Sequence, residues 1–263
     1  MDYSYWHKQE RSKPLYPDIE WSKPEQRSQA GRLGIIGGNK LGFTSLAASY
    51  SLTLKTGIGQ ARVLLPDSLR KVIPPTMTDV IFAASNPSGS LSSNAWPDIQ
   101  ALDEWASGLL LIGDAGRNSE TAILYEKLLH ESSRPLIITR DAIDLVLSSG
   151  ELLANRPHTV IVASFAQVQK LFRAVYYPKI LTFSMQLMQL VEALHKFTVT
   201  YPLTIVTFHA DTLIVASNGE ITTTPWTEPL AIWKGDIASR AACYYLWNEQ
   251  QPLRAITASI ASN

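Results

Sequence analysis

Short runs of apolar residues recur along the chain from residue 33 onward, and longer amphipathic segments separate them. Continuous apolar character is typical of strands whose two faces are both covered by helices, as in a parallel sheet. The predicted strands cover residues 33–36, 62–65, 79–84, 109–112, 136–139, 159–163 and 204–208. The segments between them have the length of crossover helices, so the pattern predicts a doubly wound α/β sheet with helices on both faces.

The amphipathic segments predict helices at eight places. These cover residues 43–56, 98–106, 119–131, 141–149, 166–175, 184–197, 236–248 and 252–261. The strongest signal is in 119–131, where Leu124 and Leu128 stack one turn apart. Asn118 or Ser119 precedes them and is of the residue type that caps free helix amides.

Residues 211–224 contain two β-rich runs on either side of Asn218-Gly219. This pair is favoured in a type I′ turn because both of its positions need a positive φ. The sequence therefore predicts an antiparallel hairpin at the edge of the mostly parallel sheet. It shows no internal repeat, and we expect a single α/β domain over residues 31–263.

Residues 1–30 differ from the rest of the chain. They contain three prolines, many charges and five aromatic residues, without a helical or strand period. We predict an irregular N-terminal arm here. Because five aromatic rings would otherwise be exposed, we expect the arm to lie against the body or a neighbouring subunit, with disorder as the alternative.

Composition narrows the class of protein. Apolar residues make up 46% of the chain and charged residues 17%, which supports a sizeable core. The 23 basic and 23 acidic residues balance, unlike the charge of a typical nucleic-acid binder. A single cysteine, no apolar leader and no run of about 18 apolar residues lead us to expect a cytoplasmic protein that binds neither nucleic acid nor membrane.

Candidate chemistry concentrates in the loops that follow the predicted strands, where ligands bind in open α/β sheets. In one such loop, Gly235 and Asp236 directly precede a predicted helix. A helix start offers free amides and about half a positive charge, which favour a phosphate. Asp236 has two interpretations: a base that deprotonates a substrate hydroxyl, or a simple helix cap.

Five segments carry a family resemblance: GRLGIIGGN (31–39), AASYSLTLKTGIGQARVLLPDSL (47–69), LIGDAGRNSET (111–121), RPLIITRDAIDLV (134–146) and KGD (234–236). The most specific part is a strand, Gly-Gly, a helix ending in Thr-Gly-x-Gly, and a strand ending in Leu-Pro-Asp-Ser-Leu. Over about residues 26–262, the chain resembles the ribokinase-like family, and more narrowly its ADP/ATP-dependent NAD(P)H-hydrate dehydratases.

The resemblance implies a reaction and a set of site residues. In that family, ADP or ATP phosphorylates the hydroxyl of hydrated NADH or NADPH, and loss of phosphate restores the cofactor. By resemblance, Asp236 is the catalytic base, Gly235 is an anion-hole amide, and Lys234 and His209 lie on the nucleotide side. The substrate side is implied to contain Gly38, Ser45, Gly116, Asp141 and Ser164. The resemblance further implies ADP or ATP as cofactor, with or without Mg²⁺, and a homo-oligomer, a tetramer in many members.

The chain departs from the family at several motif positions. The Thr-Pro-His-x-Gly-Glu loop is replaced, so that Ser164, Ala166 and Gln167 stand at its histidine, glycine and glutamate. The nucleotide-side Lys-Gly is replaced by Phe208-His209. Trp233-Lys234 occupies the first half of the Gly-Thr-Gly-Asp loop, and Thr139 stands at the first aspartate of Asp-Ala-Asp-Ala-Leu.

These departures leave alternatives open for individual residues. Lys234 is a substitute for the lost lysine or a side chain extended into solvent. His209 is a base or a structural histidine. The remaining histidines show no metal-ligand spacing, so no metal site is predicted. Cys243 is expected to pack in the core.

Three functions are compatible with this pattern. The first is a dehydratase, a nucleotide-dependent hydro-lyase of cofactor repair, with altered nucleotide contacts. The second is a non-catalytic relative that serves as a nucleotide-binding or assembly module. A small-molecule kinase ranks last, because no lid insertion is visible early in the chain.

Overall fold

The computed structural model describes residues 3–228 and 230–261. Its centre is one mixed sheet of ten strands. In spatial order these are β1 (Trp6–Lys8), β10 (Glu220–Pro225), β9 (Thr212–Ser217), β8 (Thr204–His209), β7 (Thr159–Ala163), β6 (Leu136–Thr139), β5 (Gly108–Gly113), β2 (Arg32–Gly37), β3 (Gln60–Pro66) and β4 (Val80–Ala83). All seven strands predicted from apolar runs are confirmed.

Strands β8 to β4 pair in parallel across the sheet, and only β9 is antiparallel to its two neighbours. The hairpin of β9 and β10 is confirmed with its turn at Asn218 and Gly219, which have φ values of 50° and 79°. One strand was missed: β1 pairs in parallel with β10 and so lies outside the hairpin.

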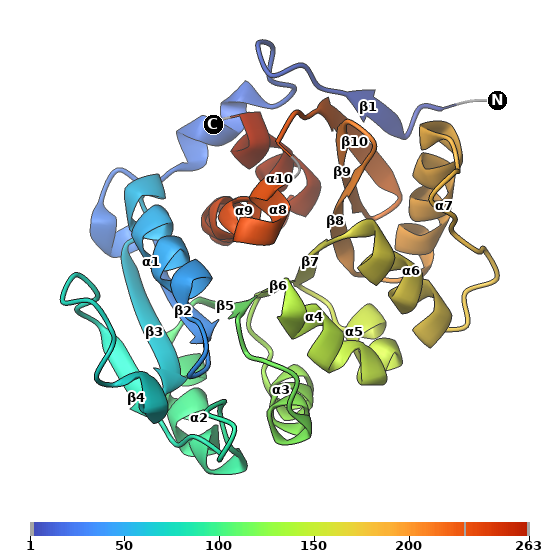
Figure 1. Cartoon of the computed structure of the whole chain (residues 1–263). Coiled ribbons are helices and arrows are strands. Elements are labelled where there is room, and N and C mark those ends of the chain that lie inside the picture. The colour runs from blue at the N-terminus through green and yellow to red at the C-terminus, as the bar shows by residue number, and fades with distance from the viewer. Residues whose placement is uncertain (1–2, 229, 262–263) are drawn as a thin grey trace.

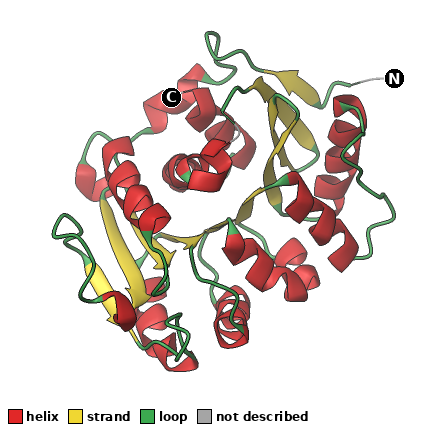
Figure 2. Cartoon of the chain, in the orientation of Figure 1, coloured by secondary structure: helices red, strands yellow, loops and turns green. Residues whose placement is uncertain are grey.

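Helices cover both faces of the sheet (Figures 1 and 2). One face packs against α1 (Thr44–Thr56), α8 (Leu230–Lys234), α9 (Asp236–Trp247) and α10 (Pro252–Ala261). The other packs against α2 (Trp96–Trp105), α3 (Ser119–Glu131), α4 (Asp141–Val146), α5 (Gly150–Asn155), α6 (Phe165–Ala174) and α7 (Leu187–Thr200). The fold is therefore the doubly wound α/β architecture that the sequence predicts.

The eight predicted helices are present, with small differences in length. Asn118 caps α3, because its side-chain oxygen accepts hydrogen bonds from the amides of Glu120 and Thr121 at 2.9 and 3.2 Å. The prediction was too simple over 141–149, where α4 ends at Val146, a 3₁₀ turn follows, and a separate α5 begins at Gly150. The short α8 was also missed.

The N-terminal arm lies against the body of the same chain. Trp6 donates its indole N–H to Thr223 at 2.9 Å, and the Tyr5 ring stacks on His195 with centroids 3.7 Å apart. Further along the arm, the Arg11 guanidinium lies 4.1 Å from the Trp226 ring centroid. These contacts leave Tyr5 and Trp6 half-buried against α7 and β10, whereas Trp21 of the same arm is 90% exposed.

Two smaller observations concern the core and the surface. Cys243 is fully buried, and burial raises the pKa of its thiol to about 12, as expected for a core cysteine. Among the described residues, no helix has both the length and the apolar character needed to cross a membrane.

Candidate functional site

The parallel topology brings the predicted site residues to one edge of the sheet. Carboxyl ends of parallel strands meet at the same edge. Each predicted site residue lies at or near the carboxyl end of a strand or at the start of a neighbouring helix. They are Gly38 after β2, Gly116 after β5, Asp141 after β6, Ser164 after β7, His209 at the end of β8, Ser45 in the first turn of α1, and Lys234, Gly235 and Asp236 at the junction of α8 and α9. They form two groups: most have polar atoms that bind other groups of the protein, whereas within the described residues the carboxylate of Asp236 does not.

Asp141 organises the loop that follows β5. Its carboxylate accepts backbone hydrogen bonds from Asp114, Ala115 and Gly116 at 2.7, 3.0 and 3.1 Å. Both carboxylate oxygens are used. Asp141 therefore holds the shape of the neighbouring loop.

Beneath this loop lies a buried phenol. Tyr125 in α3 is fully buried, and its hydroxyl has no hydrogen-bond partner among the described residues. Burial raises the pKa of this phenol, and the negative charge of Asp141 raises it further. Tyr125 therefore stays neutral under the Asp141 loop at all ordinary pH values.

Arg140 and Asp114 join the ends of β6 and β5. The Arg140 guanidinium contacts the Asp114 carboxylate at 2.5 Å, with both side chains less than one-fifth exposed. Asp114 also accepts a hydrogen bond from the amide of Ser45 at 3.1 Å, and its carbonyl accepts one from Asn39 at 2.6 Å. This pair connects the start of α1 to both strands.

The backbone at this pair is strained. Arg140 has φ 58° and ψ −140°, and Asp114 has φ 54°. Such conformations cost non-glycine residues about 1–3 kcal/mol and persist only where surrounding contacts hold them. Here the carbonyl of Arg140 accepts a hydrogen bond from Gln167 at 2.8 Å.

Ser164 and Gln167 form a capping box at the start of α6. The Ser164 hydroxyl accepts from the Gln167 amide, and the Gln167 side-chain oxygen accepts from the Ser164 amide at 3.0 Å. The Gln167 amide nitrogen also donates to Asp144 at 2.8 Å. Ser164 and Gln167 therefore stabilise the start of α6, and Gln167 also holds the Arg140 loop.

His209, the last residue of β8, contacts other residues of the chain. Its Nε2 lies 2.9 Å from the carbonyl of Met185, and its ring is 5.0 Å from that of Phe165. Phe165 in turn contacts the exposed ring of Phe183 at 4.9 Å. These contacts favour the structural interpretation of His209, and its predicted place on the nucleotide side stays a prediction.

Asp236 differs from the residues above. It is the first residue of α9, after Gly235, which has φ 88°. A Cβ on Gly235 would lie 2.6 Å from the Ile112 side chain, so glycine is required by both conformation and space. The half-buried Asp236 carboxylate accepts no hydrogen bond and forms no ion pair within residues 3–228 and 230–261, so it does not cap the helix.

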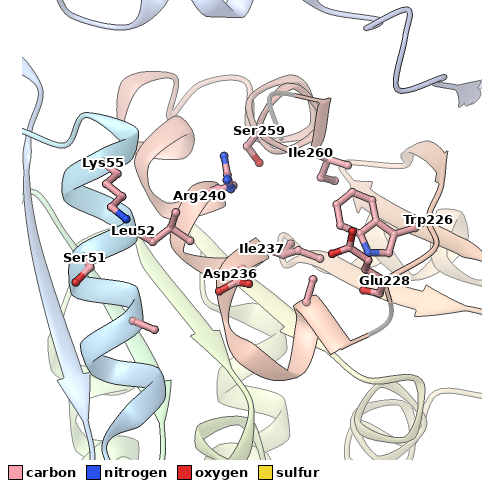
Figure 3. Close-up of a pocket in the computed structure, with 12 residues that line it drawn as sticks. Ser51, Leu52, Lys55, Trp226, Glu228, Asp236, Ile237, Arg240, Ser259 and Ile260 are labelled. Atoms are coloured by element: carbon pink, nitrogen blue, oxygen red, sulfur yellow. Dashed lines mark hydrogen bonds between the residues drawn. The ribbon is translucent and has the colours of Figure 1, made fainter.

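Asp236 lines a pocket of about 360 Å³ that extends over the outer face of α9 (Figure 3). One wall is α1, and the other is α10 with the segment after β10. The lining residues are Ala48, Ser51, Leu52, Lys55, Trp226, Glu228, Ala231, Asp236, Ile237, Arg240, Ser259 and Ile260. Lys55 of α1 and Arg240 of α9 add positive charge to the lining of this pocket.

The neighbours of Asp236 in sequence do not close this pocket. Trp233 is 52% exposed and Lys234 is exposed at the end of α8, and neither is among the lining residues. Access to the Asp236 carboxylate is therefore open. The cations of the pocket are Lys55 and Arg240, while the predicted role of Lys234 stays a prediction.

Sequence reasoning missed Lys55, Arg240 and Trp226. Arg240 carried a usable signal, because it stands one helical turn after Asp236 on the same face of the helix. Lys55 comes from α1, far from Asp236 in sequence, and Trp226 directly follows β10, so only the packing of these elements brings the two residues to the pocket. Among the described residues, no group of three or more His, Cys, Asp or Glu side chains could hold a metal ion.

Comparison with known proteins identifies the fold. No protein-family model matches the sequence, and no curated protein matches it. A ribokinase-like superfamily protein of Enterococcus faecalis matches the structure with a TM-score of 0.73 and 16% identity, over 100% of this chain and 88% of that one. A hypothetical protein of Streptococcus mutans matches with a TM-score of 0.71 and 13% identity, over 92% and 84% of the two chains.

A third solved structure has a named activity. It is the ADP/ATP-dependent NAD(P)H-hydrate dehydratase of Bacillus subtilis, co-crystallised with ATP and Mg²⁺. The TM-score is 0.62 at 13% identity, over 94% of this chain and 86% of that one. At these identities the likeness establishes the fold alone: the chain has the ribokinase-like α/β fold.

Proposed function

We propose that the protein binds ADP or ATP in the pocket over α9 and acts as a nucleotide-dependent NAD(P)H-hydrate dehydratase, with Asp236 as its base. The observation that carries this proposal is the unengaged carboxylate of Asp236 in the first turn of α9, in a pocket that also contains Lys55 and Arg240. The dehydratase of Bacillus subtilis, which was crystallised with ATP and Mg²⁺, supports a nucleotide at this fold.

Each part of the pocket has a role in this reaction. The first amides of α9 and the nearby cations favour the phosphates of the nucleotide. Asp236 accepts the proton of the substrate hydroxyl as that oxygen receives the terminal phosphoryl group of the nucleotide. The carbon–oxygen bond then breaks to release phosphate, and the adjacent carbon loses a proton to solvent as the carbon–carbon double bond forms. A positioned base contributes about 10²- to 10⁴-fold to such a rate.

Residues on the substrate side belong to the proposal in the same way. Gly38, Ser45, Gly116, Asp141 and Ser164 lie at the same edge of the sheet as Asp236. Asp141 would act indirectly, by shaping the loop at 114–116 whose amides it binds. A homotetramer also stays a prediction, which a sizing column with light scattering tests.

A second function, a nucleotide-binding or assembly module without catalysis, is favoured by one specific observation. The polar groups of Asp114, Arg140, Asp141 and Gln167 bind one another at the carboxyl edge. This leaves few free groups there to orient a second substrate. Nucleotide binding is common to both functions, and turnover separates them.

The test measures nucleotide binding and turnover on the same preparations. Saturating ADP at 100 times its dissociation constant should add about 2.7 kcal/mol and raise the Tm by a few degrees. Hydrated NADH should be converted to NADH only with ADP or ATP, and Asp236→Asn should lower the rate at least about 10²-fold.

Asp98→Asn is the matched control, because Asp98 is also half-buried in the first turn of a helix but does not line the pocket. It should retain activity. A thermal shift without turnover would favour the module, and the absence of both would contradict both functions.

A further inference from the structure

A second groove lies at the opposite edge of the sheet, where β2 and β3 begin. It has a volume of about 920 Å³ and is lined by residues of α1, of the starts of β2 and β3, and of the end of the N-terminal arm. The lining residues are Arg27, Ser28, Gln29, Gly31, Arg32, Tyr50, Leu54, Gly59, Gln60, Ala61, Arg62, Thr78, Asp79 and Ser107. Three arginines and one aspartate are its only charged residues, in a chain whose formal net charge is zero.

Two of these arginines are held through Nε. The Nε of Arg27 donates to the carbonyl of Gly59 at 3.2 Å, and the Nε of Arg62 donates to Asp79 at 2.7 Å. No further side-chain hydrogen bond engages either guanidinium within the described part of the chain, so the terminal nitrogens remain for a ligand. A guanidinium fixed at Nε presents its two terminal nitrogens to a ligand, and a planar guanidinium can bind two oxygens of one phosphate at once.

The third arginine shares an aromatic support with Arg62. The guanidinium carbons of Arg32 and Arg62 lie 5.6 and 4.3 Å from the ring centroid of Trp105. Contact with this ring orders both side chains and brings two like charges to one indole. With Asp79 neutralising only one of the three arginines, the groove holds an excess of positive charge that favours an anion.

Hydroxyl groups and exposed backbone complete the lining. The Ser107 hydroxyl accepts the amide of Arg32 at 3.1 Å and can itself donate to a ligand. Thr78 and Tyr50 place two further hydroxyls at the wall. Sites for small molecules usually have volumes of about 300–1,000 Å³, which includes this groove.

From these observations we propose that this groove is a binding site for a phosphorylated small molecule of nucleotide size. It is separate from the pocket over α9, because the groove lies at the amino ends of the strands and shares no lining residue with that pocket. The proposal therefore does not depend on the proposed dehydratase activity.

Inorganic pyrophosphate is the probe for this site, measured by calorimetry on the full chain. Arg27→Gln combined with Arg32→Gln should weaken pyrophosphate binding at least about tenfold, because the two arginines of the groove that are not paired with Asp79 are lost. Both side chains are exposed, so the variant should keep its Tm. Arg173→Gln, at another exposed arginine, and Asp236→Asn should bind pyrophosphate as the unmodified chain does.

Site-resolved protection gives an independent measurement. Phenylglyoxal modifies exposed guanidiniums, and peptide mass spectrometry reports each arginine separately. Pyrophosphate should slow modification of Arg27, Arg32 and Arg62 and leave the rate at Arg173 unchanged. Equal rates with and without pyrophosphate, or equal affinity in the Arg27/Arg32 double variant, would overturn the proposal.

Discussion

Two neighbouring regions at the carboxyl edge of the sheet use their charged residues in different ways. In the Asp114–Arg140–Asp141–Gln167 cluster, the carboxylates, the guanidinium and the amide bind one another or the backbone. In the pocket over α9, Asp236 has no such bond among the described residues and lines an open space that Lys55 also lines. The contrast separates residues that maintain the fold from those available to a ligand, although both groups lie at the same edge of the sheet.

Asp141→Ala should produce the largest loss of stability. The substitution leaves three backbone amides of the loop at 114–116 without their acceptor, and hydrogen bonds to a charged group contribute about 1.5–3 kcal/mol each in favourable cases. We expect the free energy of unfolding to fall by about 3 kcal/mol, measured by urea denaturation. A loss below about 1 kcal/mol would show that the cluster is not structural.

Gln167→Ala should have an intermediate effect. It removes half of the capping box of α6 and the bond that holds the strained Arg140 carbonyl. We expect a loss of about 1–2 kcal/mol in the same denaturation experiment. Gln169→Ala on the same helix is the control for loss of a glutamine, since within residues 3–228 and 230–261 its side chain bonds only the carbonyl of Leu181.

Asp236→Asn should change stability least. Its carboxylate lacks a partner within the described residues, so only its favourable interaction with the α9 dipole is lost, about 0.3–1 kcal/mol. A larger loss would place Asp236 with the structural cluster and remove the contrast between the regions. ADP affinity measured on the same variant then reports on ligand binding rather than on folding.

The sequence was sufficient for the sheet because the strands of a parallel sheet are apolar on both faces, and that pattern is local. It was also sufficient for the turn at Asn218-Gly219, because the preference of this pair for positive φ is local as well. The partners of the polar side chains could not be predicted from the sequence. Arg140 contacts Asp114, and Gln167 contacts Arg140, because the fold brings their loops together. The strand β1 was missed because three residues give too short a pattern to identify.

That short strand has a consequence for how the protein behaves at high concentration. Without β1, strand β10 would end the sheet with unpaired backbone donors and acceptors, which is the surface through which β proteins aggregate. The pairing of Trp6, His7 and Lys8 with Ile221, Thr222 and Thr223 covers that surface with the chain's own beginning. The sheet then ends in the three-residue β1 instead of the six-residue β10, and so short an edge strand offers other copies little backbone to pair with.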